Sequence, residues 1–155
     1  MRIMDFLNEK YVSLNLKAKN KREVLEELVE PLVKGGELEN KEEMVKVLLE
    51  REKLGSTGIG EGIAIPHGKT KTVKKLVAAF GRSVAGIDFD TLDGEPAHLF
   101  FLLVAPYDSA GPHLKALARI SRLLKDENFR EELMKASSKE ALLEAIRRQD
   151  EESKS

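Results

Sequence analysis

Hydrophobic and polar residues follow two different periods in the first third of the chain. Residues 11–16 alternate between the two kinds, which predicts a short strand because successive side chains of a strand point to opposite faces. Behind Asn20 and Asn40, apolar residues return every three to four positions, and a glutamate stands three residues after each Asn. An Asn and a Glu at this spacing can satisfy the free N–H groups of a first helical turn. We therefore predict one helix that ends at the glycine pair 35–36 and a second that runs to about Leu54.

The rest of the chain contains two long apolar segments followed by helical patterns. Residues 76–84 and 99–105 are mostly hydrophobic, which is typical of buried strands, and Asp93-Gly94 lies between them as a turn signal. A helix is expected after Gly111-Pro112, because proline is favourable in a first turn. Two further helices and a frayed polar tail complete the prediction, and they begin at Asp126, Ser137 and Gln149, respectively.

These elements predict a single α/β domain. Strands and helices alternate without a regular strand–helix–strand repeat, so we expect a mixed sheet with helices on both faces. No internal repeat or linker divides the 155 residues, of which 41% are hydrophobic, enough for a core. We predict that the domain covers residues 1–148 and that residues 149–155 form the tail.

Composition narrows the class of function. The 26 basic and 27 acidic residues are interspersed, and the net charge of −1 does not suit a nucleic-acid binder. The lack of cysteine excludes a disulfide, a thiolate zinc site and a cysteine nucleophile within this chain. The longest apolar run, residues 99–105, is far shorter than the roughly 20 residues that span a bilayer. Asp5 and Glu9 do not fit a signal peptide, so we expect a cytoplasmic protein without membrane insertion.

A glycine-rich loop is the strongest local signal. Residues 55–68 contain five of the eleven glycines. A phosphate-binding P-loop that ended at Gly68 would require glycine where Ile63 stands. The dinucleotide pattern fails as well, because its glycines would not alternate as they do from Gly58 to Gly62. Taken alone, the loop is either a connector or a cradle for a phosphoryl group.

Four side chains carry candidate chemistry, three in or next to this loop and one at the start of a later helix, each with a structural alternative. His67, between a proline and a glycine, could present a neutral imidazole as a nucleophile, although an isolated histidine more often has a structural role. His113 could donate to an anion at the start of its helix or be a partly exposed residue of its first turn. Arg51 could bind phosphoryl oxygens or complement a helix dipole. Glu61 could orient an imidazole or be a solvated loop carboxylate. None of these residues is decisive alone.

Together, residues 51–68 closely resemble the phosphorylation-site signature of the type-2 (fructose/mannitol) IIA components of the bacterial sugar phosphotransferase system. The acidic position of the signature falls at Glu52, its Leu/Ile-Gly pair at Ile59-Gly60, and its Ile-Ala-Ile-Pro-His-Gly ending at residues 63–68. Later blocks are also similar to this family, most of all to its nitrogen-regulatory branch, and extend the resemblance over roughly residues 5–146; they are residues 87–89, 93–96 and 113–124.

The resemblance implies a phosphocarrier with a mixed sheet flanked by helices and with no cofactor or metal. His67 would accept a phosphoryl group from the phosphohistidine of a small HPr-type carrier protein. Arg51 and His113 would line the phosphoryl pocket, and Glu61 would be the nearby acidic residue. The resemblance also assigns four loop residues that shape the pocket: Ser56, Thr57, Gly58 and Gly60.

Three functions remain open at this point. In the first, phosphorylation of His67 is a regulatory signal to target proteins. In the second, the group passes to a cysteine of a IIB protein during sugar uptake. In either case we expect an apolar patch around His67 to contact the partner. A remote third possibility is a zinc hydrolase that uses His67, His113 and a third ligand such as His98 or Glu61.

Overall fold

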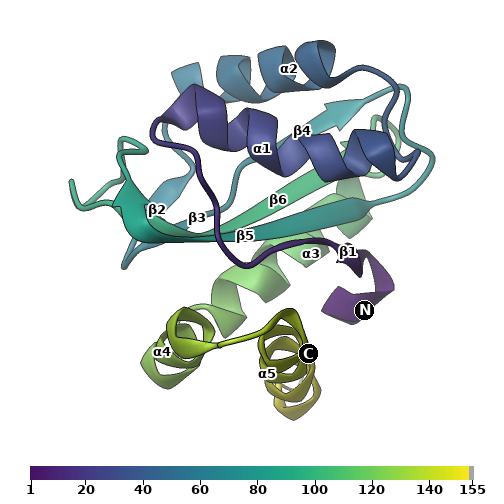
Figure 1. Cartoon of the computed structure of the whole chain (residues 1–155). Coiled ribbons are helices and arrows are strands. Elements are labelled where there is room, and N and C mark those ends of the chain that lie inside the picture. Colours follow the sequence, from purple (N-terminus) through teal and green to yellow (C-terminus); the bar gives the residue numbers. More distant parts are fainter. Residues whose placement is uncertain (154–155) are drawn as a thin grey trace.

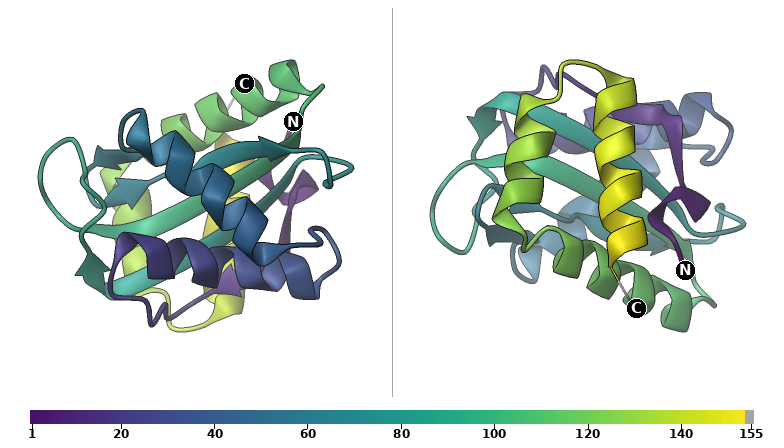
Figure 2. Two further views of the ribbon diagram at one scale, coloured as in Figure 1. Left: turned by 90° about the horizontal axis from the view of Figure 1, so that it is seen from above. Right: turned by 90° about the horizontal axis from the view of Figure 1, so that it is seen from below.

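A single mixed sheet lies between two layers of helices in the computed structural model, which describes residues 1–153 (Figure 1). Helices α1 and α2 cover one face of the sheet, and α3, α4 and α5 cover the other (Figure 2). This arrangement confirms the predicted fold class. The elements in chain order are η1 (Ile3–Asp5), β1 (Leu7–Ser13), α1 (Lys21–Lys34), α2 (Lys41–Lys53), β2 (Gly58–Gly60), β3 (Ile63–Ala64), β4 (His67–Thr70), β5 (Val77–Ile87), β6 (Ala97–Pro106), α3 (Ala110–Leu123), α4 (Glu127–Lys135) and α5 (Lys139–Glu152).

Strand β6 organises the sheet. It pairs antiparallel with β5, and β5 pairs parallel with the edge strand β1. On its other side, β6 pairs parallel with both β3 and β4, which follow one another along the same edge. His67, the first residue of β4, is opposite Leu103 in this register. The site residue is thus fixed to the central strand of the sheet.

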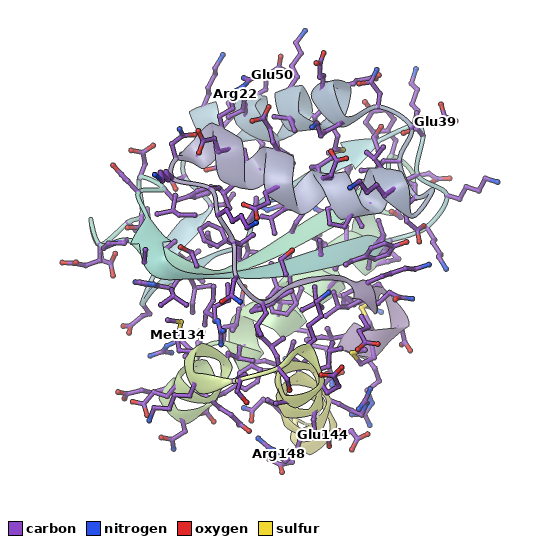
Figure 3. All side chains as sticks on the ribbon, viewed as in Figure 1. Arg22, Glu39, Glu50, Met134, Glu144 and Arg148 are labelled. Atoms are coloured by element: carbon purple, nitrogen blue, oxygen red, sulfur yellow. The ribbon has the colours of Figure 1, made fainter. Side chains whose placement is uncertain are left out.

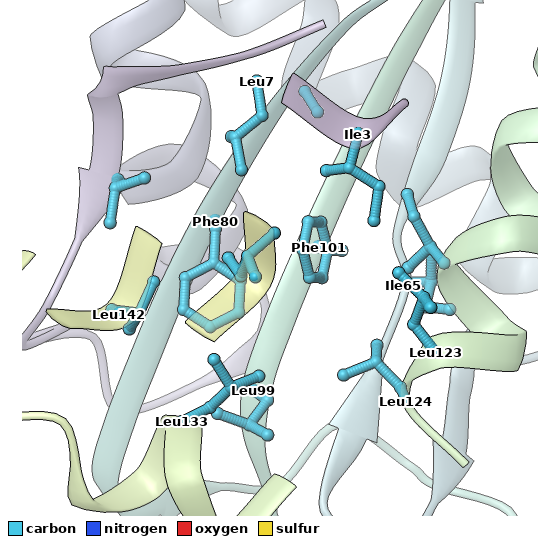
Figure 4. Packing of buried hydrophobic residues seen from close by; sticks show 14 of the residues in the cluster. Ile3, Leu7, Ile65, Phe80, Leu99, Phe101, Leu123, Leu124, Leu133 and Leu142 are labelled. Carbon is cyan, nitrogen blue, oxygen red and sulfur yellow. The ribbon is translucent and has the colours of Figure 1, made fainter. Parts of the chain in front are cut away.

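Because β6 is buried on both faces, its alternating side chains supply two separate cores. Leu99, Phe101 and Leu103 face the layer of α3, α4 and α5, in the cluster shown in Figure 4. In that cluster the rings of Phe80 and Phe101 meet edge to face, with centroids 4.9 Å apart. The intervening residues of β6 pack under α1 and α2; they are Phe100, Leu102 and Val104. A run of apolar residues without alternation is what a strand covered on both faces requires.

Local capping explains where the helices begin. The side chains of Asn20, Asn40 and Asp126 each accept a hydrogen bond from the backbone N–H three residues later, as the sequence predicted. The last helix is capped by Ser138 rather than by Ser137, a shift of one residue. Charged side chains extend outward from both helical layers (Figure 3). Among residues 1–153, no helix is both long enough and apolar enough to cross a membrane.

Two predicted boundaries are wrong. The first strand spans Leu7–Ser13 instead of residues 11–16, because a register shift between Leu7 and Val12 interrupts the alternation that would reveal it. The predicted tail is also misplaced: α5 continues to Glu152, and Asp150 within it is buried. The remainder of the predicted tail, residues 154–155, lies outside the described residues.

An internal ion pair explains why the last turns of α5 are ordered. The guanidinium of Arg119, on α3, donates to the carboxylate of Asp150, and both side chains are almost fully buried. The backbone N–H of Ile3 also donates to this carboxylate at 2.7 Å, and Arg2 donates to the Asp150 carbonyl at 2.9 Å. One carboxylate therefore joins the start of the chain, α3 and α5.

Replacing Arg119 with Ala should destabilise the protein by about 3–5 kcal/mol, because it leaves the Asp150 charge buried without its cation. Arg147→Ala is the matched control, since Arg147 pairs with Glu144 at the surface and such pairs contribute roughly 1 kcal/mol or less. Urea unfolding followed by circular dichroism gives both free energies. Equal losses in the two variants would contradict a dominant role for the buried pair.

Candidate functional site

The backbone of β4 sets the direction of His67. A Cβ atom on the next residue, Gly68, would lie 3.1 Å from Val47 and 3.2 Å from Met44, so glycine lets this strand pack directly against α2. Successive side chains of a strand point to opposite faces, and His67 therefore points away from α2, toward α3. There it meets His113, with the two ring centroids 5.5 Å apart and the ring planes inclined by 54°.

The His67 ring is held by one hydrogen bond that decides its tautomer. Its Nδ1 lies 2.8 Å from the carbonyl oxygen of Ile65. A carbonyl can only accept, so Nδ1 carries the proton and Nε2 keeps its lone pair in the neutral ring. Burial lowers the pKa of His67, and the positive charge of Arg51 lowers it further. The Ile65 hydrogen bond and Glu52 act in the opposite direction without reversing the shift, which favours a neutral nucleophile at pH 7.

His113 supplies a buried and unpartnered polar atom next to His67. It lies in the first turn of α3 and is only 6% exposed. Its Nδ1 has no hydrogen-bond partner among the described residues. Burial, together with the neighbouring His67 and Lys69, lowers the pKa of His113 to about 4. The ring is therefore neutral at pH 7, and a buried nitrogen without a partner is unusual.

Arg51 provides the positive charge of the site. It lies in the last turn of α2, and its Nη1 donates to the carbonyl of Gly55 at 2.9 Å, at the start of the glycine-rich loop. Its positive charge lowers the pKa of His67. The structure thus brings together three predicted site residues from three different elements: Arg51, His67 and His113.

The four predicted loop residues are held by contacts with Glu52 and with the β5–β6 connection. Ser56 donates to the Phe89 carbonyl at 2.7 Å and accepts from the Gly58 N–H at 2.9 Å. A Cβ on Gly58 would collide with Thr91 at 2.6 Å, and Gly60 has a φ of +99° that disfavours any other residue. Thr57 is buried and donates through both its N–H and its hydroxyl to Glu52. The N–H groups of Thr57 and Gly58 are therefore already engaged within the protein.

Glu61 does not lie at the site, contrary to the sequence-based expectation. Its side chain is 72% exposed and pairs with Arg130 at 3.2 Å. The strand register gives its distance from His67. The carbonyl of Gly62, next to Glu61, accepts from the N–H of Leu99, whereas His67 is opposite Leu103, four positions further along β6. At about 3.3 Å per residue, this separation is roughly 13 Å. A shared loop in the sequence suggested proximity, but the strand register separates the two residues.

The acidic residue near His67 is Glu52, which the sequence analysis identified only as a position of the signature. It lies in the last turn of α2, is 7% exposed, and raises the pKa of His67. Its place directly after Arg51, at the end of a helix that leads into the glycine-rich loop, was the available signal. Glu52 therefore takes the place that was expected for Glu61.

The third ligand required by the zinc-hydrolase hypothesis does not accompany the two histidines of the site. Nδ1 of His98 is 2.8 Å from the Ser83 carbonyl, at the end of β6 opposite to His67, and Glu61 pairs with Arg130. Over residues 1–153, no three side chains of the His, Cys, Asp or Glu type are grouped so that they could hold a metal ion. His67 and His113 stand with an arginine, a donor set suited to an anion.

Comparisons with known proteins identify the family to which the chain belongs. The family described as "Phosphoenolpyruvate-dependent sugar phosphotransferase system, EIIA 2" matches residues 5–149. The chain is 43% identical over 150 residues to the PTS system fructose-specific EIIABC component of Bacillus subtilis, a match that covers 97% of this chain and 24% of that protein. The chain therefore spans about a quarter of the length of this relative.

Two solved structures share both the fold and a clear sequence similarity. The nitrogen regulatory protein IIA-Ntr from Neisseria meningitidis superposes with a TM-score of 0.86 at 34% identity, covering 92% of this chain and 97% of that one. Enzyme IIA-mannitol of Escherichia coli, solved in complex with phosphorylated enzyme IIB-mannitol, gives 0.76 at 30% identity, with coverages of 91% and 98%. The family expected from residues 51–68 is thereby confirmed, and the chain belongs to the type-2 EIIA family of the sugar phosphotransferase system.

Proposed function

We propose that this protein is a cytoplasmic phosphocarrier in which Nε2 of His67 accepts a phosphoryl group from the phosphohistidine of an HPr-type carrier protein. The hydrogen bond from Nδ1 to Ile65 carries this proposal, because it leaves Nε2 unprotonated and free to attack. His67 is half-buried, which favours its neutral ring. The neighbouring His113 and the charge of Arg51 can stabilise negative charge on a phosphoryl group bound to Nε2.

The transfer balances without a cofactor. The bond between phosphorus and the donor nitrogen breaks as a bond to Nε2 forms, and the donor nitrogen recovers its lone pair. Nδ1 of His67 keeps its proton on the Ile65 carbonyl throughout. The arriving group brings close to two negative charges, which the guanidinium of Arg51, whose charge acts on His67, can stabilise.

His113 is suited to follow that change of charge. Before transfer its pKa is held near 4 by burial and by its neighbours, so the ring is neutral. A dianionic phosphoryl group on His67 favours the protonated form of His113, which can then donate a charge-assisted hydrogen bond. A neutral ring in the resting protein avoids a permanent buried charge, and it releases its hold once the phosphoryl group leaves.

Two onward uses of the group are supported by different relatives. Similarity to Neisseria IIA-Ntr favours a regulatory role, in which phosphorylation alters binding to target proteins. Similarity to the fructose-specific component favours transfer to a IIB cysteine during sugar uptake, and the mannitol complex shows that a IIA protein binds its IIB partner. No cysteine occurs in these 155 residues, so any thiol acceptor lies outside them. Incubating the phosphoprotein with purified IIB proteins separates the two uses.

The segments around His67 also present apolar side chains to a partner. Leu54 follows α2 and is 84% exposed, Tyr107 precedes α3 and is 57% exposed, and Leu114 adjoins His113 and is 64% exposed. Exposed large apolar residues in segments next to a reactive group favour a protein partner. We assign the contact with the carrier protein to these residues.

His67→Ala should abolish phosphorylation. The wild-type protein, mixed with phosphoenolpyruvate, enzyme I and an HPr-type carrier, should gain one acid-labile, alkali-stable phosphoryl group in intact-mass analysis. His98→Ala is the matched control and should be phosphorylated like the wild type, because His98 lies at the opposite end of β6. Phosphorylation of the His67 variant would refute the assignment.

His113→Ala should bind the carrier normally but accept the group about 100-fold more slowly, because it removes one stabilising donor and leaves the nucleophile intact. Stopped-flow rates of phosphoryl transfer, with affinities from titration calorimetry, distinguish the two effects. Arg122→Ala, an exposed change near the other end of α3, should leave both quantities unchanged. Wild-type rates in the His113 variant would remove it from the mechanism.

The pH dependence should follow the two site histidines. In NMR titrations of the unphosphorylated protein, His113 should protonate at a pH of about 4 and His67 below its usual 6.5. Protonation blocks the lone pair of Nε2, so acceptance of the phosphoryl group should fall as the pH drops through the lowered pKa of His67. A midpoint for His67 above 6.5 would contradict the neutral nucleophile.

A further inference from the structure

We propose that Glu52 positions His67 for phosphoryl transfer, acting through the peptide groups of Thr57 and Ile65. The proposal rests on the phosphocarrier role of His67 given above. Glu52 does not touch the phosphoryl position itself, so it is a positioning residue. Its influence reaches the imidazole through a chain of hydrogen bonds that begins at α2 and ends at Nδ1.

This series of hydrogen bonds begins at the buried carboxylate of Glu52, which accepts from every one of its partners. Glu52 accepts from the Thr57 N–H at 3.1 Å and from the Thr57 hydroxyl. Its third partner is the ammonium of Lys21, at 3.2 Å. A buried carboxylate is costly unless it is paired and hydrogen-bonded, and here three donors satisfy it. Glu52 therefore holds Thr57 through two bonds in a defined orientation.

Two backbone bonds continue the chain to the nucleophile. The carbonyl of Thr57 accepts from the Ile65 N–H at 3.0 Å, and the carbonyl of Ile65 accepts from Nδ1 of His67 at 2.8 Å. Thr57 and Ile65 each donate through the N–H and accept through the carbonyl, so the orientation of one backbone segment constrains that of the next, from Glu52 to the imidazole. This arrangement fixes both the orientation of the ring and its Nδ1–H tautomer.

The negative charge of Glu52 raises the pKa of His67, in the direction opposite to burial and Arg51. The charged or titratable residues that act on the two site histidines are Arg51 and Glu52 on α2, Lys69 on β4 and His113 on α3. Burial and Arg51 lower the pKa of His67, whereas Glu52 raises it. A more basic nitrogen is a better nucleophile, provided it stays unprotonated at the working pH. Glu52 thus preserves basicity that the buried site would otherwise remove.

Lys21 holds the carboxylate of Glu52 through an ion pair. This first residue of α1 donates to Glu52 and, at 3.0 Å, to Asp90, and its ammonium lies 4.7 Å from the centre of the Phe89 ring. Phe89 in turn accepts the hydroxyl of Ser56 through its carbonyl. The glycine-rich loop is therefore fastened to α1 and to the β5–β6 connection, which gives Glu52 a fixed support.

Four variants test the proposal. Glu52→Gln removes the charge, and Thr57→Val removes the hydroxyl while keeping the side-chain shape and the N–H group. Thr57→Ser restores a hydroxyl, and Glu50→Gln makes the same charge change at an exposed position two residues earlier on α2 (Figure 3). The readouts are the NMR titration midpoint and Nδ1–H signal of His67 in unphosphorylated protein, and the rate of phosphorylation by the carrier.

We expect Glu52→Gln to lower the titration midpoint of His67 and to slow phosphorylation by about 10- to 100-fold, the range for a misplaced reacting group. Thr57→Val should shift both readouts in the same direction by a smaller factor, whereas Thr57→Ser and Glu50→Gln should match the wild type. A purely structural Glu52 would lower the melting temperature of the variant without moving the midpoint of His67.

A wild-type midpoint and rate in folded Glu52→Gln would overturn the proposal. If this variant does not fold, Thr57→Val decides in its place, and wild-type values there would likewise overturn the inference. Absence of phosphorylation in the wild-type protein is a different result: it would refute the phosphocarrier role, while the NMR readouts would still establish whether Glu52 sets the state of the imidazole.

Discussion

One hydrogen bond, from Nδ1 of His67 to the carbonyl of Ile65, makes the site possible. Ile65 and Pro66 lie between β3 and β4, which run along the same side of β6. The Pro66 carbonyl accepts from the Leu103 N–H on β6, whereas the Ile65 N–H donates to the Thr57 carbonyl, next to the Gly58–Ala64 pair of β2 and β3. The carbonyl of Ile65 accepts Nδ1 of His67, and this bond determines which imidazole nitrogen can react.

A carrier must hold a phosphoryl group and then release it, and the helices around His67 contribute to both tasks. Helix α2 contributes Arg51 and Glu52 side by side, so that a cation and an anion act on the imidazole from one helical turn. Helix α3 contributes His113, whose neutral ring adds no permanent charge. A site with a stronger fixed positive charge would bind the phosphoryl group more firmly but would part with it less easily.

Local signals were sufficient to predict much of the fold. The caps at Asn20, Asn40 and Asp126 act within one turn, so the sequence alone located those helices. The ends of β1 and α5 were missed because they depend on distant partners, Val77–Ile87 for the strand and Arg119 for Asp150. The spacing of hydrophobic and polar residues along the sequence does not reveal such long-range contacts.

The same distinction applies to the site. The residue types around His67 were predictable from residues 51–68, and His113 came from a later block of the resemblance. The choice between Glu61 and Glu52 was not predictable, because one lies within the glycine-rich loop and the other just before it in the sequence. The register of β3 and β4 on β6 carries Glu61 away, while the end of α2 brings Glu52 close. Only long-range pairing could separate the two carboxylates.

The tie between Asp150 and the first residues of the chain has a consequence for biosynthesis. Ile3 and Arg2 bond to a residue almost 150 positions later, so these contacts can form only after Asp150 has been synthesised. Edge strand β1 can also pair with β5 only after α1, α2 and the site loop have been made. Contacts of such separation slow folding, because a long loop must close before they stabilise anything. The first residues of the chain should therefore dock late in folding, only after α5 has been synthesised.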